Sequence, residues 1–143
     1  KLDAVELRER IAAMPLFESL TPTQIHLVAE RCTEVKFQEG TDVIRQGDVG
    51  DALYIITRGT ADVLRYPDAG VDSSEESGEK LLAQLDAWKA FGERALVRNE
   101  TRYATVRATS MELHVMSINR DVVEKALGLK LSEVFKELDY EKK

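Results

Sequence analysis

The sequence predicts an α+β fold, in which an antiparallel β-barrel or jelly roll of about eight strands carries helices at both ends. Three observations lead to this class. Residues 1–32 show helical periodicity and capping residues, the middle of the chain changes to short β-branched runs separated by glycine, and the end returns to a helical pattern. We therefore expect one domain over 1–143, with N-terminal helices at 1–32, the barrel at 33–118 and C-terminal helices at 119–143.

The first predicted helix runs from Leu2 to Ala13, because apolar residues recur near helical spacing among good helix formers. Pro15 should end it, since proline inside a helix removes a hydrogen bond and clashes with the preceding turn. Leu16 and Phe17 follow as an apolar pair that looks exposed.

The second predicted helix begins with a capping box. Thr21 stands at the N-cap, Pro22 at the first helical position and Gln24 three residues after the cap. We expect this helix to run from Pro22 to about Arg31.

The middle of the chain alternates with period two and is rich in β-branched residues, as strands require. The candidate strands are Thr33–Phe37, Asp42–Arg45, Ala52–Thr57, Ala61–Tyr66, Lys80–Leu85, Ala104–Ala108 and Met111–Ile118. Short strands punctuated by glycine indicate a compact antiparallel barrel or jelly roll. A closed sheet would also remove exposed edge strands.

Two more helices are expected after the strands. Asn119 is a good N-cap for a helix through Leu127, and Gly128 is a good terminator. A last helix should follow, because an apolar stripe recurs at helical spacing. This stripe consists of Leu131, Val134, Phe135 and Leu138.

Composition favours a soluble domain without a membrane span. Of the 143 residues 32% are charged and 43% apolar, and no apolar run approaches the roughly 20 residues that a membrane span needs. The single cysteine, Cys32, excludes an internal disulfide and favours a reducing, cytoplasmic location, where we expect a half-buried structural thiol. The net charge of −6 argues against a general nucleic-acid surface.

The segment 91–106 carries the strongest chemical signal. Gly92 follows an apolar strand end and lets the backbone approach a ligand closely, and a short helix after it would present unpaired N–H groups to an anion. Arg102 adds a fork of donors that suits phosphate oxygens, and Glu93 can accept hydrogen bonds from sugar hydroxyls. From spacing alone, a strand-end turn with solvated charges is an equal alternative.

The residues of this segment resemble a known cassette. Phe91-Gly92-Glu93-Arg94-Ala95-Leu96 and Arg102-Tyr103-Ala104-Thr105-Val106 are similar to the phosphate-binding cassette of eukaryotic cyclic-nucleotide-binding domains. Such domains occur in protein kinase A regulatory subunits and cGMP-dependent protein kinases. The resemblance implies that Glu93 accepts the ribose 2′-hydroxyl and that Arg102 binds the phosphate. The implied ligand-binding residues are Gly92, Glu93, Arg94, Ala95, Arg102, Tyr103 and Ala104.

The resemblance extends to neighbouring segments. The run 46–51 (Gln-Gly-Asp-Val-Gly-Asp) and Gly59 match turns of these domains, and we expect their glycines to shape the backbone through positive φ. By the same resemblance, Asp62 should pair with Arg102. The family usually has a glycine just before Phe-Gly-Glu, and here Ala87 and Trp88 occupy that neighbourhood, so the turn must be made another way. We expect Trp88 to pack at the rim of the barrel.

By resemblance, the chain is a non-catalytic regulatory domain that binds cGMP or cAMP without a metal. The family relays binding through its C-terminal helices to a protein kinase, so the expected partners are a kinase catalytic domain or neighbouring cyclic-nucleotide-binding domains. Tyr103 stands where family members carry threonine or alanine. The residues Phe-Gly-Glu-Arg-Ala-Leu of the cassette are closer to those of cGMP-dependent kinases, which slightly favours cGMP. Tyr140 is the first choice for a residue that caps the base, with Phe135 and Leu138 as rivals.

Three alternatives compete with this interpretation. A metal-dependent barrel enzyme would need clustered ligands, but the sequence has only His26 and His114, and for His114 a surface or packing role is expected. A barrel that serves as a protein-interaction scaffold without nucleotide would not need both Glu93 and Arg102. A DNA-binding regulator of the bacterial type would need a helix-turn-helix after the last barrel helix, and this acidic sequence has no such motif.

Overall fold

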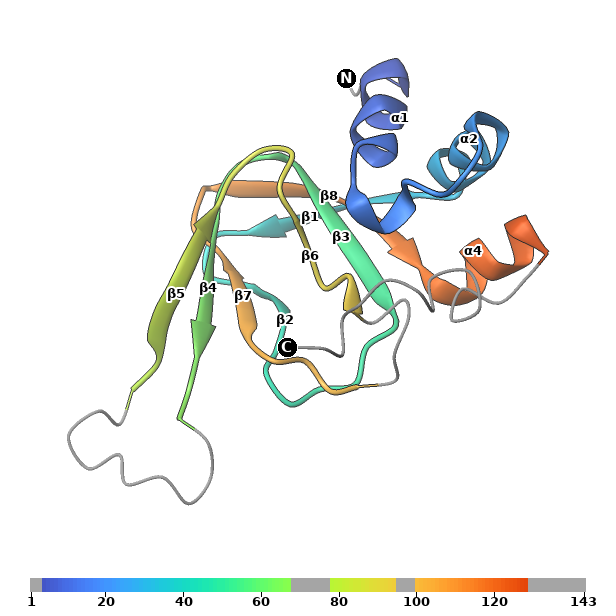
Figure 1. Cartoon of the computed structure of the whole chain (residues 1–143). Helices are drawn as coiled ribbons and strands as arrows, with labels where there is room; N and C mark the ends of the chain where they lie inside the picture. Colours follow the sequence, from blue (N-terminus) through green and yellow to red (C-terminus); the bar gives the residue numbers. More distant parts are fainter. Residues whose placement is uncertain (1–3, 68–77, 95–99, 129–143) are drawn as a thin grey trace.

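Two four-stranded antiparallel sheets form the body of the protein in the computed structural model, which describes residues 4–67, 78–94 and 100–128 (Figure 1). The first sheet has the order β1-β8-β3-β6 and the second β2-β7-β4-β5. Their bounds are Thr33–Gln38 (β1), Asp42–Ile44 (β2), Ala52–Arg58 (β3), Ala61–Arg65 (β4), Lys80–Leu85 (β5), Ala90–Phe91 (β6), Thr105–Ala108 (β7) and Glu112–Asn119 (β8). The predicted jelly roll is confirmed. The expected closed barrel is wrong for the described strands, because they form two separate sheets with β5 at an edge.

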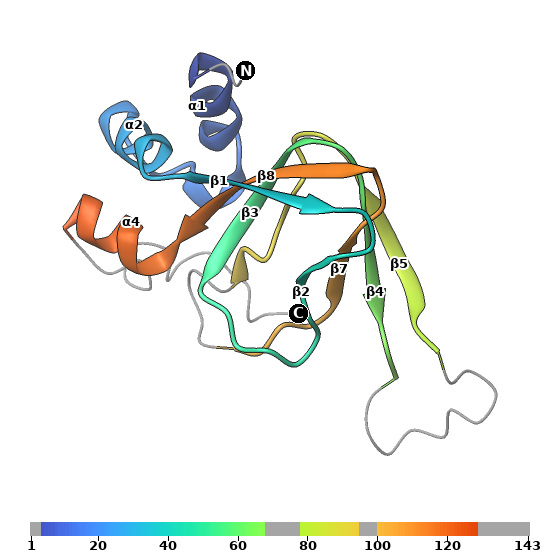
Figure 2. The same cartoon turned by 180° about the vertical axis from the view of Figure 1, so that it is seen from behind.

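The helices cover the face of the first sheet that points away from the second sheet (Figures 1 and 2). Their bounds are Ala4–Ala12 (α1), Pro15–Phe17 (the 3-10 helix η1), Pro22–Glu30 (α2) and Arg120–Leu127 (α4). Both predicted caps are present: Thr21 and Gln24 exchange the two hydrogen bonds of a capping box, and Asn119 Oδ1 accepts from the Asp121 amide at 2.9 Å. None of the helices described is long and apolar enough to cross a membrane. The predicted last helix lies outside the described residues.

Leu16 and Phe17 correct one expectation. They are 2% and 0% exposed, whereas the sequence suggested an exposed pair. The helix η1 turns both side chains into the core between the helices and the first sheet, where they meet Ile11 of α1 and Val28 of α2. The pair therefore anchors the N-terminal helices to the sheet.

The central strands of the first sheet, β3 and β8, are buried on both faces, because the helices cover one face and the second sheet covers the other. In β3, Leu53 and Ile55 pack against the helices, while Ile56 faces the second sheet. In β8, Met116 faces the helices and Val115 faces the second sheet. Side chains alternate along a strand, so one strand supplies both cores.

A row of ionic contacts ties the second sheet together on its outer face. Arg107 of β7 donates from Nε to Asp42 at 2.6 Å and makes two hydrogen bonds of 2.8 Å to the carboxylate of Glu79. The hydrogen bonds from Arg107 hold the pKa of Glu79 below its usual value. The contacts of Arg107 thus connect strands β7 and β2 with the segment that leads into β5.

The surroundings of Cys32 and His114 indicate a packing role for both side chains. The thiol of Cys32 is half-buried and lies 3.5 Å from the Val28 carbonyl, and burial raises its pKa to about 12, as expected for a structural thiol. His114 is buried in β8, with its ring nitrogens 3.4 Å from a Glu34 oxygen and 3.0 Å from a Glu112 oxygen. The packing role predicted for His114 is therefore confirmed.

Candidate functional site

A cavity of about 760 Å³ brings the predicted site residues together. Its lining includes Gly92, Glu93, Arg94, Arg102, Tyr103 and Ala104. Ala95 lies outside the described residues. Apolar side chains from both sheets, among them Ile44, Val63, Phe91 and Val106, complete the wall. An open cavity of this size with a few convergent polar groups is typical of a small-molecule site.

Arg102 is the most constrained polar side chain of the cavity. It is 8% exposed, and its guanidinium donates from Nη2 to the Ala52 carbonyl at 3.0 Å and from Nη1 to the Gly92 carbonyl at 3.3 Å. Its own backbone is fixed as well, because its amide donates to Asp48 at 2.7 Å and its carbonyl accepts from Gly47 at 2.9 Å. Arg102 therefore has a defined position before any ligand enters.

The charge of Arg102 is poorly solvated in this position. Burial lowers the pKa of its guanidinium, and nearby Tyr54 and Asp51 oppose that effect. Among the described residues, its side chain donates to two neutral carbonyls and to no carboxylate. An anion in the cavity would add negative charge to that of nearby Asp51, since a buried cation without a directly hydrogen-bonded counter-charge is costly.

Two glycines make room for this guanidinium. A Cβ atom on Gly92, where φ is +82°, would come within 2.8 Å of Arg102 Nη1. A Cβ atom on Gly50 would lie 2.3 Å from Arg102 Nε. Positive φ is confirmed for Gly47 (+92°) and Gly59 (+101°), but Gly50 is needed for the space that Arg102 occupies and not for its φ.

The expected pairing of Asp62 with Arg102 is not present in the structure. Asp62 lies opposite Arg107 in the β4–β7 ladder, on the outer-face row, and accepts from Gln84 at 3.4 Å. Residues that alternate along a strand point to opposite faces, so Asp62 faces away from the cavity that Val63 lines. The side chain of Arg102 is held by backbone groups instead.

Trp88 makes the turn before the cassette in a conformation that usually requires glycine. Its φ is +70°, and its amide donates to the Ile56 carbonyl at 2.6 Å. Its ring packs against the core under the helices, with the Arg10 guanidinium 5.1 Å from the ring centroid. Packing of the indole offsets the cost of a left-handed backbone, and the predicted packing role is confirmed.

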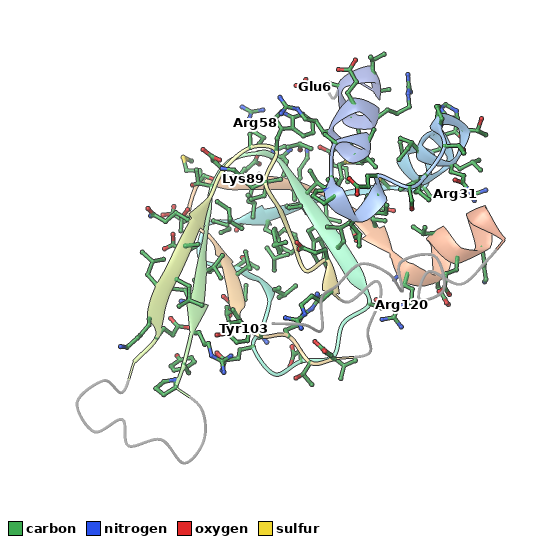
Figure 3. The ribbon with its side chains drawn as sticks, in the orientation of Figure 1. Glu6, Arg31, Arg58, Lys89, Tyr103 and Arg120 are labelled. Atoms are coloured by element: carbon green, nitrogen blue, oxygen red, sulfur yellow. The ribbon has the colours of Figure 1, made fainter. Side chains whose placement is uncertain are left out.

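Arg65 is a cavity residue that the sequence analysis missed. It ends β4, lines the cavity and donates from Nη1 to the Tyr103 carbonyl. Its guanidinium carbon lies 4.0 Å from the centroid of the ring of Tyr103, a residue that is 64% exposed and is labelled in Figure 3. Alternation along the strand was a usable signal, because Ala61 and Val63 point inward and Arg65 shares their face.

The other polar groups of the cavity are more ordinary. Glu93 is half-buried, immediately after Gly92, and Arg94 forms an ion pair with Glu100 at 3.5 Å. Gln46 uses both ends of its amide on the backbone of Tyr66. Among residues 4–67, 78–94 and 100–128, no group of three or more His, Cys, Asp or Glu side chains is arranged to hold a metal ion.

Comparison with known proteins agrees with the resemblance. Residues 34–128 match the family model of the cyclic nucleotide-binding domain. A cAMP-dependent protein kinase regulatory subunit of Blastocladiella emersonii is 34% identical, over 90% of this chain and 30% of the relative. A cGMP-dependent protein kinase of Toxoplasma gondii is 32% identical, over 86% of this chain and 11% of the relative. The chain thus spans less than a third of each of these relatives.

Solved structures share the fold. The cAMP-bound protein PfPKA-R (141-441) superposes with a TM-score of 0.79 at 22% identity, over 96% of this chain and 45% of that one. A cyclic nucleotide-binding-like protein of Brucella abortus has a TM-score of 0.73 at 26% identity, over 86% of this chain and 98% of that one. The two-sheet architecture with flanking helices is therefore that of known structures.

Proposed function

The chain belongs to the cyclic nucleotide-binding domain family, and from this membership we propose that it binds a cyclic nucleoside monophosphate in the 760 Å³ cavity. One observation carries the proposal. Arg102 is buried in the wall of the cavity, and within the described part of the chain its guanidinium donates to the neutral carbonyls of Ala52 and Gly92 and to no carboxylate, so a phosphate diester would supply a directly bonded counter-charge.

The proposed roles follow from the lining of the cavity. Arg102 binds the exocyclic oxygens of the cyclic phosphate, and Glu93 accepts a hydrogen bond from the ribose 2′-hydroxyl. Backbone amides near Gly92 and Ala104, together with that of Ala95, complete the phosphate site. Apolar residues of both sheets leave room for the purine. Arg94 and Tyr103 lie at the rim of the same cavity.

We propose that the domain is regulatory and acts on a protein kinase in the same or an associated chain. Its relatives are a kinase regulatory subunit and a kinase, and α4 follows directly on β8 and contacts α2. Movement of the C-terminal helices would relay binding to a kinase catalytic domain or to a neighbouring cyclic-nucleotide-binding domain. Hydrogen exchange over 129–143 that is identical with and without nucleotide would exclude this relay.

From the residues of the cassette we expect a slight preference for cGMP over cAMP. Isothermal titration calorimetry of the 143-residue chain with both nucleotides tests the proposal, with 5′-GMP as an open phosphate control. Arg102→Ala should lower the affinity by about 2–5 kcal/mol, as expected for a desolvated charge contact. Arg107→Ala is a matched control, because this arginine lies on the outer face. A protein scaffold without nucleotide would bind neither ligand and would be insensitive to Arg102→Ala.

A further inference from the structure

The turn before the cassette is held in a conformation that its own residues disfavour. The Lys89 amide donates to the Asp86 carbonyl at 3.1 Å, so residues 86–89 form a β-turn with Trp88 at its third position. Among the described residues, Trp88 is the only residue other than glycine with a positive φ, and a type II turn has glycine or asparagine at this position. Other contacts must therefore offset the strain of the Cβ atom.

The contacts that hold Trp88 come from a strand and from a helix. Its amide donates to the Ile56 carbonyl at 2.6 Å, and the Ile56 amide donates to the Lys89 carbonyl at 2.9 Å, which fixes the turn to β3. Its ring packs against the core beneath the helices, and the guanidinium carbon of Arg10 on α1 lies 5.1 Å from the ring centroid. A cation over an indole face is attractive even at a partly exposed site. The position of α1 thus contributes to the shape of the turn.

Strand β6 connects this turn to the candidate phosphate site. It consists of Ala90 and Phe91 and lies at the edge of the first sheet, where it pairs with β3. Gly92 follows directly, and its carbonyl accepts from Arg102 Nη1 at 3.3 Å. Because so short an edge strand has few hydrogen bonds to resist displacement, a change of φ at Trp88 would redirect the chain that leads to Gly92.

We infer that Trp88 is a positioning residue for the nucleotide site, because the packing of its ring under α1 keeps the 86–89 turn in the shape that places Gly92 beside Arg102. This inference rests on the proposed function. Docking of α1 then strengthens nucleotide binding, and nucleotide strengthens the docking of α1 by the same factor. A turn made by glycine would need no such support from the helix.

Two substitutions of Trp88 separate the shape of the turn from the loss of the ring. Trp88→Ala keeps the strain of the Cβ atom without the packing that offsets it, so the turn relaxes, and we expect cGMP and cAMP to bind roughly 5- to 20-fold more weakly. Trp88→Gly also lacks the ring but adopts the required φ, and its affinities should stay within about threefold of wild type. Isothermal titration calorimetry of the 143-residue chain measures these affinities, and circular dichroism shows that each variant is folded. Equal losses in the two variants would overturn the inference.

Arg10 tests whether the support comes from α1. Arg10→Ala removes the cation over the ring and should weaken both nucleotides by about two- to fivefold in the wild-type background. In the Trp88→Gly background the same substitution should have almost no effect, since the turn no longer depends on the ring. Arg8→Ala, which removes the same charge from the same helix, is the matched control. An Arg10→Ala loss of the same size in both backgrounds would show that α1 acts by another route and would refute the coupling through Trp88.

Failure of this inference differs from failure of the proposed function. If the wild-type chain binds neither nucleotide, the proposed function fails and the inference with it. Wild-type binding that Trp88→Ala leaves unchanged would overturn the inference alone. Weaker binding of only one nucleotide in Trp88→Ala would also contradict it, because the turn acts on the phosphate site that both nucleotides share.

Discussion

The contact between Gly50 and Arg102 allows the role of the buried guanidinium to be tested without changing the arginine. In Gly50→Ala, the added methyl carbon would lie 2.3 Å from Arg102 Nε, 2.4 Å from Nη2 and 2.5 Å from Cζ. The φ of Gly50 is not in the left-handed region, so the backbone accepts alanine. The side chain of Arg102 must therefore move away.

The cost follows from the bonds that the displaced guanidinium loses. Arg102 would give up its hydrogen bonds to the Ala52 and Gly92 carbonyls, each of a kind worth about 1.5–3 kcal/mol, and would recover part of this by contact with water. We expect the free energy of unfolding to fall by about 1–3 kcal/mol. With a slope of roughly 2 kcal/mol per molar urea, the midpoint falls by about 1 M. Nucleotide affinity should fall roughly 10- to 100-fold, because Arg102 no longer points at the phosphate site.

Urea unfolding followed by the fluorescence of Trp88, the single tryptophan, measures the first effect, and calorimetry measures the second. Gly78→Ala is the matched control, because its Cβ would meet nothing within 4 Å, and its stability should change by less than about 0.5 kcal/mol. In an Arg102→Ala background, Gly50→Ala should cost almost nothing, since the clashing atoms are gone. An undiminished loss in that background would refute the proposed steric cause.

Two predictions concern other parts of the fold. Trp88→Gly should be more stable than Trp88→Ala by about 1 kcal/mol, because glycine adopts a φ of +70° without the strain of a Cβ atom. Circular dichroism during urea unfolding measures this difference. Equal stabilities of the two variants would contradict a strained turn. The contact between Glu79 and Arg107 should make stability depend on pH. The pKa of Glu79 is lowered in the folded state, so its contribution is fully present above about pH 4.5, the ordinary value, and is lost as the pH falls through the lowered pKa. The stability difference between wild type and Glu79→Gln should therefore shrink as the pH is lowered below 4.5, and a difference that is constant with pH would refute the assignment.

Local patterns in the sequence predicted most of the fold. The Thr21 capping box, the Asn119 cap and the glycine turns depend on neighbours within a few residues, so their geometry can be inferred without knowing the rest of the chain. The predicted strand ranges agree with the observed ones to within one residue at each end, because short runs rich in β-branched and apolar residues are bounded by turn residues such as glycine. The resemblance of the cassette then pointed to Arg102, Glu93 and their neighbours, which the structure places around one cavity.

Long-range contacts account for what the sequence analysis missed. Leu16 and Phe17 look exposed next to Pro15, and only the docking of the helices on the first sheet buries them. Asp62 lies near Arg102 in the family pattern, but the strand pairing turns it to the outer face beside Arg107. Each of these outcomes depends on residues that are far away in the chain.

The amino-acid sequence by itself determined the class of fold, the helix ends and the segment that holds the candidate phosphate site, since these depend on short-range periodicity, capping and motif spacing. Only the tertiary structure decided that Gly50 leaves space for Arg102, that Trp88 replaces a glycine by packing under α1, and that Arg65 stacks on Tyr103 in the cavity. The reason is physical: these features arise where strands from distant parts of the chain pair, and the available space, backbone acceptors and charge environment exist only after that pairing.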